Sequence, residues 1–314
     1  MARPMSPGWP HEAEGNLRPR WMVAGPPLGA GDRTRLTGPL RFDIFPSRWG
    51  FVVTEDTLLV QKQDGVATVV INRPGQHNAI MRAMWQCIPQ IFEELEEDGE
   101  TRVIVLRGAG EKAFASGQDI TEFRDTTTPE AARAHSGLID GVLARIAAIR
   151  LPIIAMVHGF GMGGAVGLLA VCDLRYAAED AVIAVPAARL GIVYPEPLTR
   201  LIMGLIGPAN TKEMLMTARR YPAEEALRIG FLTRVFPKAE LEKETYEVAR
   251  VIATNAPISV RNSKQMVNLI QTDALPPEEA GRARALRLAG FSSQDFSEGV
   301  DAFLNKRPPV FRGV

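Results

Sequence analysis

The stretch from Leu151 to Cys172 reads LPIIAMVHGFGMGGAVGLLAVC, and it decides the fold class. Its length and apolar character resemble a membrane span, because about 20 apolar residues cross a bilayer. Pro152, His158 and five glycines indicate instead a buried strand, a tight turn and a buried helix in a globular core. We therefore expect a strand over residues 153–157, a helix that begins among the glycines, and no membrane insertion.

The residues before this stretch add strands and one helix. From Leu58 the sequence LLVQKQDGVATVVINRP predicts two strands joined by a hairpin turn at Asp64-Gly65. A helix is expected over about residues 79–97, kinked at Pro89, and residues 103–106 are typical of a buried strand. Strands that alternate with helices in this way predict an α/β core.

The residues after the stretch change in character at about Pro208. Helices are predicted in TKEMLMTARR, in PAEEALRIG with its stop at Gly230, and in ELEKETYEVARVIATN. Their apolar stripes must meet the core or another subunit. Residues 1–55 are rich in Pro, Gly and Arg without sustained periodicity, so we expect a poorly ordered extension ahead of a domain over residues 56–314.

Composition excludes several classes of function. The 36 basic and 36 acidic side chains cancel, and no basic run is long enough to form a nucleic-acid interface, so a small-molecule substrate is expected. Cys87 and Cys172 cannot form the disulfide framework of a small secreted domain, which favours a reducing, cytoplasmic location. No Cys, His, Asp and Glu cluster has metal-ligand spacing, so no metal is expected.

Two loops rich in small residues are candidates for ligand binding. One is FASGQDI at residues 114–120, and the other is GFGMGGA at residues 159–165. Small residues allow close approach of backbone to a ligand, and unpaired N–H groups at the start of a helix favour an anion or a developing oxyanion. Either loop alone is weak evidence, because most such loops merely turn the chain.

Five ordered segments together are far more specific than either loop. They are INRPGQHNAI, GEKAFASGQDI, the segment from VHGFGMGGAVG to GIVYPE, the segment GPANTKEMLMTARRYPAEEALRIGFLTRV, and SEGVDAFLNKRPPVF. In this order and spacing they resemble the enoyl-CoA hydratase/isomerase (crotonase) superfamily over about residues 58–314. The resemblance implies a spiral of ββα units over about residues 56–207, then a helical region over about residues 208–314 that builds trimers, often paired into hexamers.

The same resemblance implies an acyl-CoA substrate held by a backbone oxyanion hole. Its two N–H donors fall at Gln118, inside SGQD, and Gly164, inside MGGA. Two such donors would stabilise an enolate or a tetrahedral oxyanion, as other oxyanion holes do. Coenzyme A would enter as part of the thioester substrate of fatty acid metabolism, and no separate cofactor is implied.

The resemblance also implies contacts to coenzyme A. The adenine-recognising backbone falls at Ser116 and the neighbouring Asp119 and Ile120. Lys306 and Arg307, in NKRPP, match a basic pair that lies near the CoA phosphates in relatives. An ordinary solvated face is the alternative interpretation of this pair.

The departures from the family pattern concern proton transfer. Hydratases of the family use two glutamates around the thioester, because water addition places one proton and removes another. Gly167 and Ala187 stand at these two positions here, and Pro195 stands where dienoyl-CoA isomerases have a third acid. Glu196 could supply an acid or base if the loop shifts by one residue. The alternative for Glu196 is a solvent-facing loop glutamate.

Three further polar residues receive structural assignments. His158 is expected to be a hydrogen-bonded structural histidine at the end of a strand, and Asp173 and Arg175 match a family segment that is chiefly structural.

These observations leave three functions open. The first is an enzyme of enolate chemistry on acyl-CoA: a hydratase, isomerase, lyase or hydrolase. The second is a non-catalytic acyl-CoA-binding or scaffold member that lost its acids at Gly167 and Ala187. The third is an RNA-associated role, against which the zero net charge argues.

Overall fold

The computed structural model describes residues 57–122, 129–271, 285, 289, 293–305 and 307–314. The expected extension at residues 1–55 and the predicted phosphate contact Lys306 lie outside the described residues.

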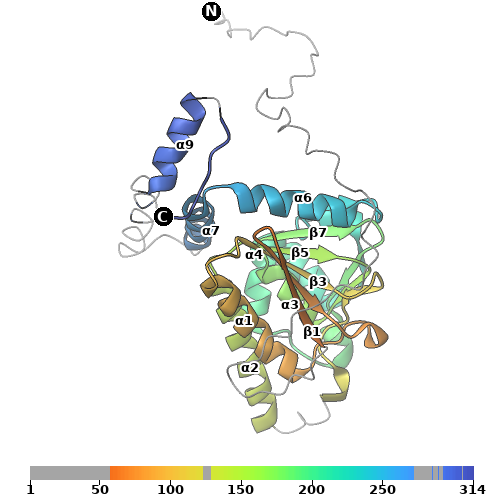
Figure 1. Cartoon of the computed structure of the whole chain (residues 1–314). Helices are drawn as coiled ribbons and strands as arrows, with labels where there is room; N and C mark the ends of the chain where they lie inside the picture. The colour runs from red at the N-terminus through yellow and green to blue at the C-terminus, as the bar shows by residue number, and fades with distance from the viewer. Residues whose placement is uncertain (1–56, 123–128, 272–284, 286–288, 290–292, 306) are drawn as a thin grey trace, which may run out of the picture. The chain divides into compact units, whose positions relative to one another are not determined.

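The main sheet has six strands in the order β1-β2-β3-β5-β7-β10 (Figure 1). These strands are β1 Leu58–Gln63, β2 Val66–Ile71, β3 Val103–Gly108, β5 Ile153–Val157, β7 Leu174–Ala178 and β10 Arg234–Phe236. β1 and β2 pair antiparallel, and every other neighbouring pair is parallel. The predicted hairpin is confirmed: Asp64 and Gly65 have φ of 51° and 76°, as a tight two-residue turn requires.

A second sheet carries the glycine-rich loops. Its order is β4-β6-β8-β9, formed by β4 Ala113–Ala115, β6 Phe160–Met162, β8 Val182–Ala184 and β9 Tyr221–Pro222. The sequence did not predict β6, because its three residues lie among glycines. A Cβ at Gly161 would lie 2.9 Å from Leu169 Cδ1 and 3.0 Å from Ile183 Cδ1, so glycine allows this strand to pack closely on its neighbours.

The described helices are α1 Arg82–Glu97, α2 Pro129–Ala148, α3 Gly164–Val171, α4 Glu196–Thr217, α5 Ala223–Arg228, α6 Leu241–Thr254, α7 Pro257–Gln271 and α9 Gln294–Leu304. Two 3₁₀ helices, η2 Pro74–Gln76 and η4 Pro186–Leu190, accompany them. The predicted helices are present, with shifted starts: the first begins at Arg82, and the helix expected from residue 211 is the part of α4 that follows Gly207. Non-helical dihedrals at Gly207, with φ of 74°, interrupt α4.

Two apolar cores cover the main sheet. The larger core joins the sheet to α1, α2 and α3, and the smaller one packs α6 through Leu241 and Ala249 (Figure 1). The predicted α/β class is therefore confirmed. The break in α4 at Gly207 falls at the expected division at residues 207 and 208, and the short strands β9 and β10 lie beyond it among the helices.

The stretch that resembled a membrane span is divided among β5, β6 and α3, as the glycines indicated. Among the described residues, no helix combines the length and the apolar character needed to cross a membrane.

Candidate functional site

The two glycine-rich loops meet beside the start of α3. Ile80 holds the first loop in place, because its N–H donates to the Gly117 carbonyl (2.8 Å) and its carbonyl accepts from the Asp119 N–H (3.0 Å). Gly117 has φ of 100°, and a Cβ there would lie 2.6 Å from the Met162 carbonyl oxygen and 3.1 Å from the Gly164 nitrogen. Only glycine allows these two backbones to approach so closely.

Gly164 is the first residue of α3, so its N–H has no carbonyl four residues earlier within the helix. A Cβ at Gly164 would lie 3.6 Å from the Gln118 nitrogen and 3.3 Å from Trp85 Cζ2. The Gln118 and Gly164 nitrogens therefore border one small space next to a buried indole. This space also faces the positive end of the helix dipole.

The peptide before Gly164 is fixed from several sides. Gly163 has φ of 56° and ψ of −122°, a backbone conformation that glycine adopts readily. Its N–H donates to the Ala184 carbonyl (2.8 Å), and its carbonyl accepts from the Val166 N–H (3.0 Å). The Tyr194 hydroxyl donates to the same Gly163 carbonyl (3.0 Å).

A side chain at the first position expected for an acid would collide with Leu198. A Cβ at Gly167 would lie 2.3 Å from Leu198 Cδ2, and Leu198 is buried in the first turns of α4. The leucine occupies the space that a side chain from position 167 would need. Sequence reasoning missed Leu198 and Trp85, because neither residue type carries chemistry and only the packing brings them to the site.

Of the other two acid positions, Ala187 lines an open groove, and Pro195 lies between two residues that line it, Tyr194 and Glu196. Ala187 lies in η4, and Pro195 caps the N-terminus of α4. The groove beside them has a volume of about 680 Å³, within the range of small-molecule sites. Most of the residues that line it are apolar, namely Ala187, Ala188, Ile192, Val193, Met203, Leu215 and Met216. The polar ones are Tyr194, Glu196, Thr199 and Arg200.

Glu196 lies on the border of this groove. It is the first residue of α4, its side chain is 68% exposed, and its carboxylate pairs with Arg200 one turn later (2.6 Å). A pair this exposed contributes little to stability. Glu196 therefore lines the same groove as Tyr194. Its exposed, ion-paired carboxylate also fits the alternative prediction of a solvent-facing glutamate.

The residues predicted to recognise adenine lie on the first loop. Ser116 and Ile120 are exposed, and the Ser116 N–H donates to the His77 carbonyl (2.9 Å). The Asp119 carboxylate accepts from Arg73 Nη1 (2.8 Å) and from the Thr121 hydroxyl (2.7 Å). The bond from Arg73 contributes most to holding the pKa of Asp119 below its ordinary value. Asp119 thus anchors the loop that carries Gln118.

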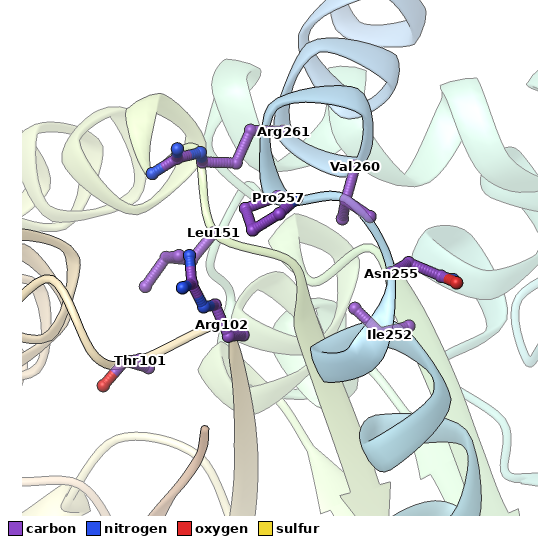
Figure 2. Close-up of a pocket in the computed structure, with 8 residues that line it drawn as sticks. All are labelled: Thr101, Arg102, Leu151, Ile252, Asn255, Pro257, Val260 and Arg261. Atoms are coloured by element: carbon purple, nitrogen blue, oxygen red, sulfur yellow. The ribbon is translucent and has the colours of Figure 1, made fainter. Parts of the chain in front are cut away.

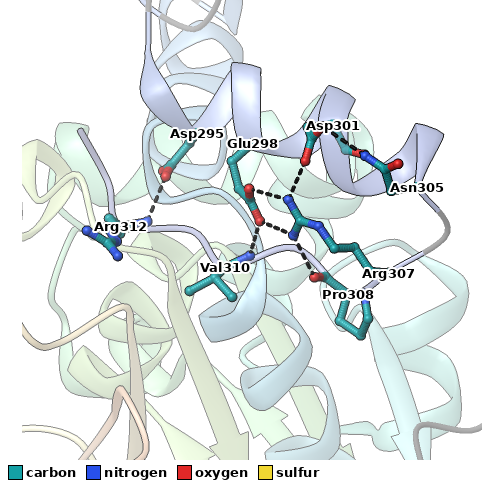
Figure 3. A network of polar contacts seen from close by, with 8 residues as sticks. All are labelled: Asp295, Glu298, Asp301, Asn305, Arg307, Pro308, Val310 and Arg312. Atoms are coloured by element: carbon teal, nitrogen blue, oxygen red, sulfur yellow. Dashed lines mark hydrogen bonds and ion pairs between the residues drawn. The ribbon is translucent and has the colours of Figure 1, made fainter.

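Arg307 belongs to a polar network at the end of the described chain (Figure 3). Its guanidinium donates to both Glu298 oxygens (2.7 and 2.8 Å) and to Asp301 (2.6 Å). The Val310 N–H donates to Glu298 (2.8 Å). Arg307 and the Val310 N–H together lower the pKa of Glu298 to about 2. The network fastens residues 307–314 along α9.

A much smaller pocket lies where strands β3 and β5 begin, beside the end of α6 and the start of α7 (Figure 2). Arg102, Leu151, Pro257 and Arg261 are among its lining residues, and its volume is about 10 Å³. That space holds one water molecule at most. It is too small to be a substrate site.

Arg175 and His158 are buried, and Asp173 is partly buried. Asp173 accepts from the Ile153 N–H (2.7 Å) and from Lys264 (2.8 Å), and Arg175 donates to the carbonyls of Phe231 and Cys172, which confirms their structural role. His158 is also buried, but its Nδ1 has no partner among the described residues, so the expected full hydrogen bonding is wrong. Burial lowers the pKa of His158.

The described residues contain no group of three or more His, Cys, Asp or Glu side chains that could hold a metal ion.

Comparison with known proteins supplies the context for this geometry. The family model described as enoyl-CoA hydratase/isomerase matches residues 61–314. The short-chain-enoyl-CoA hydratase of Clostridium acetobutylicum is 33% identical over 252 residues, which cover 80% of this chain and 96% of that protein. The crotonyl-CoA hydratase of Syntrophomonas wolfei is 33% identical over 257 residues, covering 82% and 98%.

Solved structures resemble the fold closely. A crystal structure described as an enoyl-CoA hydratase/carnithine racemase from Magnetospirillum magneticum matches with a TM-score of 0.78 at 31% identity, covering 82% of this chain and 96% of that one. The enoyl-CoA hydratase of Bacillus anthracis matches with a TM-score of 0.77 at 32% identity, covering 82% and 100%.

Proposed function

The chain belongs to the enoyl-CoA hydratase/isomerase family, and from this premise we propose that it polarises the carbonyl of an acyl-CoA thioester between two backbone N–H groups. The donors are the N–H groups of Gln118 and Gly164. One observation carries the proposal: glycines at 117 and 164 bring the two nitrogens to the border of one space at the start of α3.

The chemistry follows from where charge develops. Removal of an α-proton, or attack of water on a conjugated β-carbon, moves negative charge onto the thioester oxygen. Two N–H donors and the helix dipole stabilise that oxygen more than the neutral carbonyl, and each donor contributes on the order of 10²–10³ in rate. The site therefore favours enolate chemistry: hydration or isomerisation of an enoyl-CoA, or a related lyase or hydrolase reaction.

The acid or base in this proposal is Glu196. It lines the groove with Tyr194, although its carboxylate pairs with Arg200. If Glu196 transfers the proton, Glu196→Gln abolishes turnover, whereas Arg200→Gln releases the carboxylate and keeps turnover. Full activity of Glu196→Gln would remove Glu196 from the mechanism.

The groove beside Ala187 suits the acyl group. Ile192, Val193, Met203 and Met216 contribute apolar surface, so an aliphatic acyl chain would bury carbon against carbon. A carboxylated acyl group would leave its charge in an apolar setting. We expect aliphatic acyl-CoA esters to bind more tightly than dicarboxyl-CoA esters of equal length in a calorimetric comparison.

The CoA contacts in this proposal are Ser116, Asp119, Ile120, Lys306 and Arg307. If the basic pair binds the phosphates, the affinity for a CoA ester falls with salt and falls further in Lys306→Ala. Arg307 also holds Glu298, so Glu298→Gln is the matched control that loosens this network and keeps the cation. An affinity unchanged in Lys306→Ala and Arg307→Ala would exclude the contact.

A non-catalytic acyl-CoA-binding protein is the second candidate. The observation that favours it is the packing of Leu198 against Gly167, which closes one of the two acid positions. Such a protein would keep the oxyanion hole as a binding feature and would bind CoA esters without turnover.

Deuterium incorporation at the α-carbon of acyl-CoA and enoyl-CoA esters in D₂O, read by mass spectrometry, separates these candidates. Gly164→Pro removes one donor N–H, and proline suits the first position of a helix. Gly164→Ala keeps the N–H but places a Cβ 3.6 Å from the Gln118 nitrogen, between the two donors, so it should also lower exchange by obstructing the site. Tyr246→Phe, which removes a hydrogen bond to Thr68 away from the two loops, is the control. Exchange that is lost in Gly164→Pro and kept in Tyr246→Phe supports the enzyme. Binding without exchange in the wild type supports the second candidate.

The proposal includes assembly into a homotrimer or homohexamer and a cytoplasmic location. Exposed apolar side chains on α4, α6 and α9, among them Met216, Val251 and Leu304, support a self-association surface. Two buried free thiols suit a reducing compartment.

A further inference from the structure

The Tyr194 hydroxyl bonds to the peptide that carries one of the two donors. Tyr194 lies between η4 and α4, and its Oη donates to the Gly163 carbonyl oxygen (3.0 Å). The backbone N–H of Gly167, one turn into α3, interacts with the same phenol oxygen. The hydroxyl therefore spans the first turn of the helix that begins at Gly164.

The Gly163 carbonyl and the Gly164 N–H belong to one peptide unit. This unit is planar, and in its trans form the C=O and N–H bonds point in opposite directions. A hydrogen bond that fixes the carbonyl therefore also fixes the direction of the N–H. Donation to a carbonyl also polarises the peptide and makes its N–H a stronger donor.

The surroundings keep this hydroxyl protonated. Tyr194 is half-buried, and burial raises its pKa, so the phenol remains a donor at neutral and mildly alkaline pH. Ala184 holds the other end of the Gly163 residue through its carbonyl (2.8 Å). The peptide that carries the donor at Gly164 is thus held from both sides, by the Tyr194 hydroxyl and by the Ala184 carbonyl.

We propose that Tyr194 is the positioning residue of the oxyanion hole: its hydroxyl aims and strengthens the Gly164 N–H through the Gly163 carbonyl. This inference rests on the proposed function, because it assigns the alignment of the same donor. It requires no proton transfer from Tyr194 and no contact between Tyr194 and the thioester.

Acetoacetyl-CoA is a suitable probe, because its enolate absorbs in the near ultraviolet and its keto form does not. The ratio of bound enolate to bound keto form measures stabilisation of the oxyanion. We expect Tyr194→Phe to lower this ratio about tenfold, the effect of losing roughly one hydrogen bond. Binding of butyryl-CoA should change less than threefold. The control is Tyr246→Phe, which removes the hydrogen bond between the Tyr246 hydroxyl on α6 and Thr68 Oγ1 on β2 (2.8 Å). This variant should leave the ratio unchanged.

The outcomes separate this inference from the proposed function. A wild-type protein that binds acetoacetyl-CoA only in the keto form would overturn the oxyanion hole and the role of Tyr194 with it. A wild-type enolate signal that persists in Tyr194→Phe would overturn the role of Tyr194 alone. Replacement of Tyr194 by 3-fluorotyrosine, a stronger donor of nearly the same size, gives a second reading. It should raise the enolate ratio, and a fall would contradict the inference.

Discussion

At the scale of single residues, the site is defined by what is missing at position 167. The family resemblance implies an acid at this position, whereas the residue is glycine and Leu198 packs against it. The two residues therefore form one packing unit, and a carboxylate at position 167 would have to displace the Leu198 side chain.

We expect Gly167→Glu to lower the free energy of unfolding by about 1–3 kcal/mol through overpacking, with a further cost for a buried carboxylate. Leu198→Ala alone should cost about 2–5 kcal/mol, because it opens a cavity. In the double variant the glutamate enters that cavity. Gly167→Glu should therefore lower the free energy of unfolding less in the Leu198→Ala background than in the wild type. Urea unfolding of all four proteins measures this coupling. Equal costs in both backgrounds would show that Leu198 does not occupy the space.

Both cysteines should be inert in the folded protein. Burial raises the pKa of Cys172 from 9.0 to about 12 and also raises that of Cys87. Because only the thiolate reacts, an aromatic disulfide reagent at pH 8 should modify neither thiol until denaturant is added. The raised pKa also means that the contribution of Cys172 to stability is complete below pH 9 and declines as the pH rises toward 12. Rapid modification of the native protein would contradict this burial.

At the scale of secondary structure, the sequence predicted the elements with regular patterns and missed those set by contacts. The hairpin at Asp64-Gly65 and the strand over residues 153–157 followed from turn chemistry and apolar runs. Strand β6 was not predicted, because three residues among glycines carry no periodic signal. The part of α4 before Gly207 was not predicted, because Gly207 and Pro208 separate it from the helical pattern that follows.

The segment formed by α9 and residues 307–314 is held by carboxylates. Glu298 has a pKa of about 2, below its ordinary 4.5, so its stabilisation is complete above pH 4.5 and is lost as the pH falls toward 2. A ¹³C NMR titration of Glu298 should give a midpoint near 2. In Arg307→Gln the midpoint should rise toward 4.5, because the guanidinium is the largest cause of the shift. An unchanged midpoint would place Arg307 outside the network of Figure 3.

At the scale of the whole molecule, the motifs of the sequence and the backbone indicate the same family. The resemblance correctly predicted the family and the α/β class, because ordered motifs specify a backbone. It could not predict Leu198 against Gly167, or the bond from Tyr194 to Gly163, because those contacts join segments about 30 residues apart. Such contacts depend on packing, which a single sequence does not display.

The proposed assembly makes a prediction at the same scale. Leu304 on α9 is 72% exposed and Val251 on α6 is 59% exposed, a large apolar exposure for surfaces that meet only water. Light scattering should give a mass of three or six chains of 34.3 kDa. Val251→Lys should shift the mass toward one chain. A monomer at micromolar concentration in the wild type would contradict the assembly.

The central claim is that the N–H groups of Gln118 and Gly164 hold the thioester oxygen, and the carbonyl stretching frequency of a bound ¹³C-labelled acyl-CoA tests it most directly. Hydrogen bonds lengthen and polarise a carbonyl, so infrared difference spectra should show a lower frequency for the thioester bound to the wild type than for the free thioester. Gly164→Pro should return most of the frequency toward that of the free thioester. A bound carbonyl at the same frequency as the free thioester in the wild type would contradict the oxyanion hole.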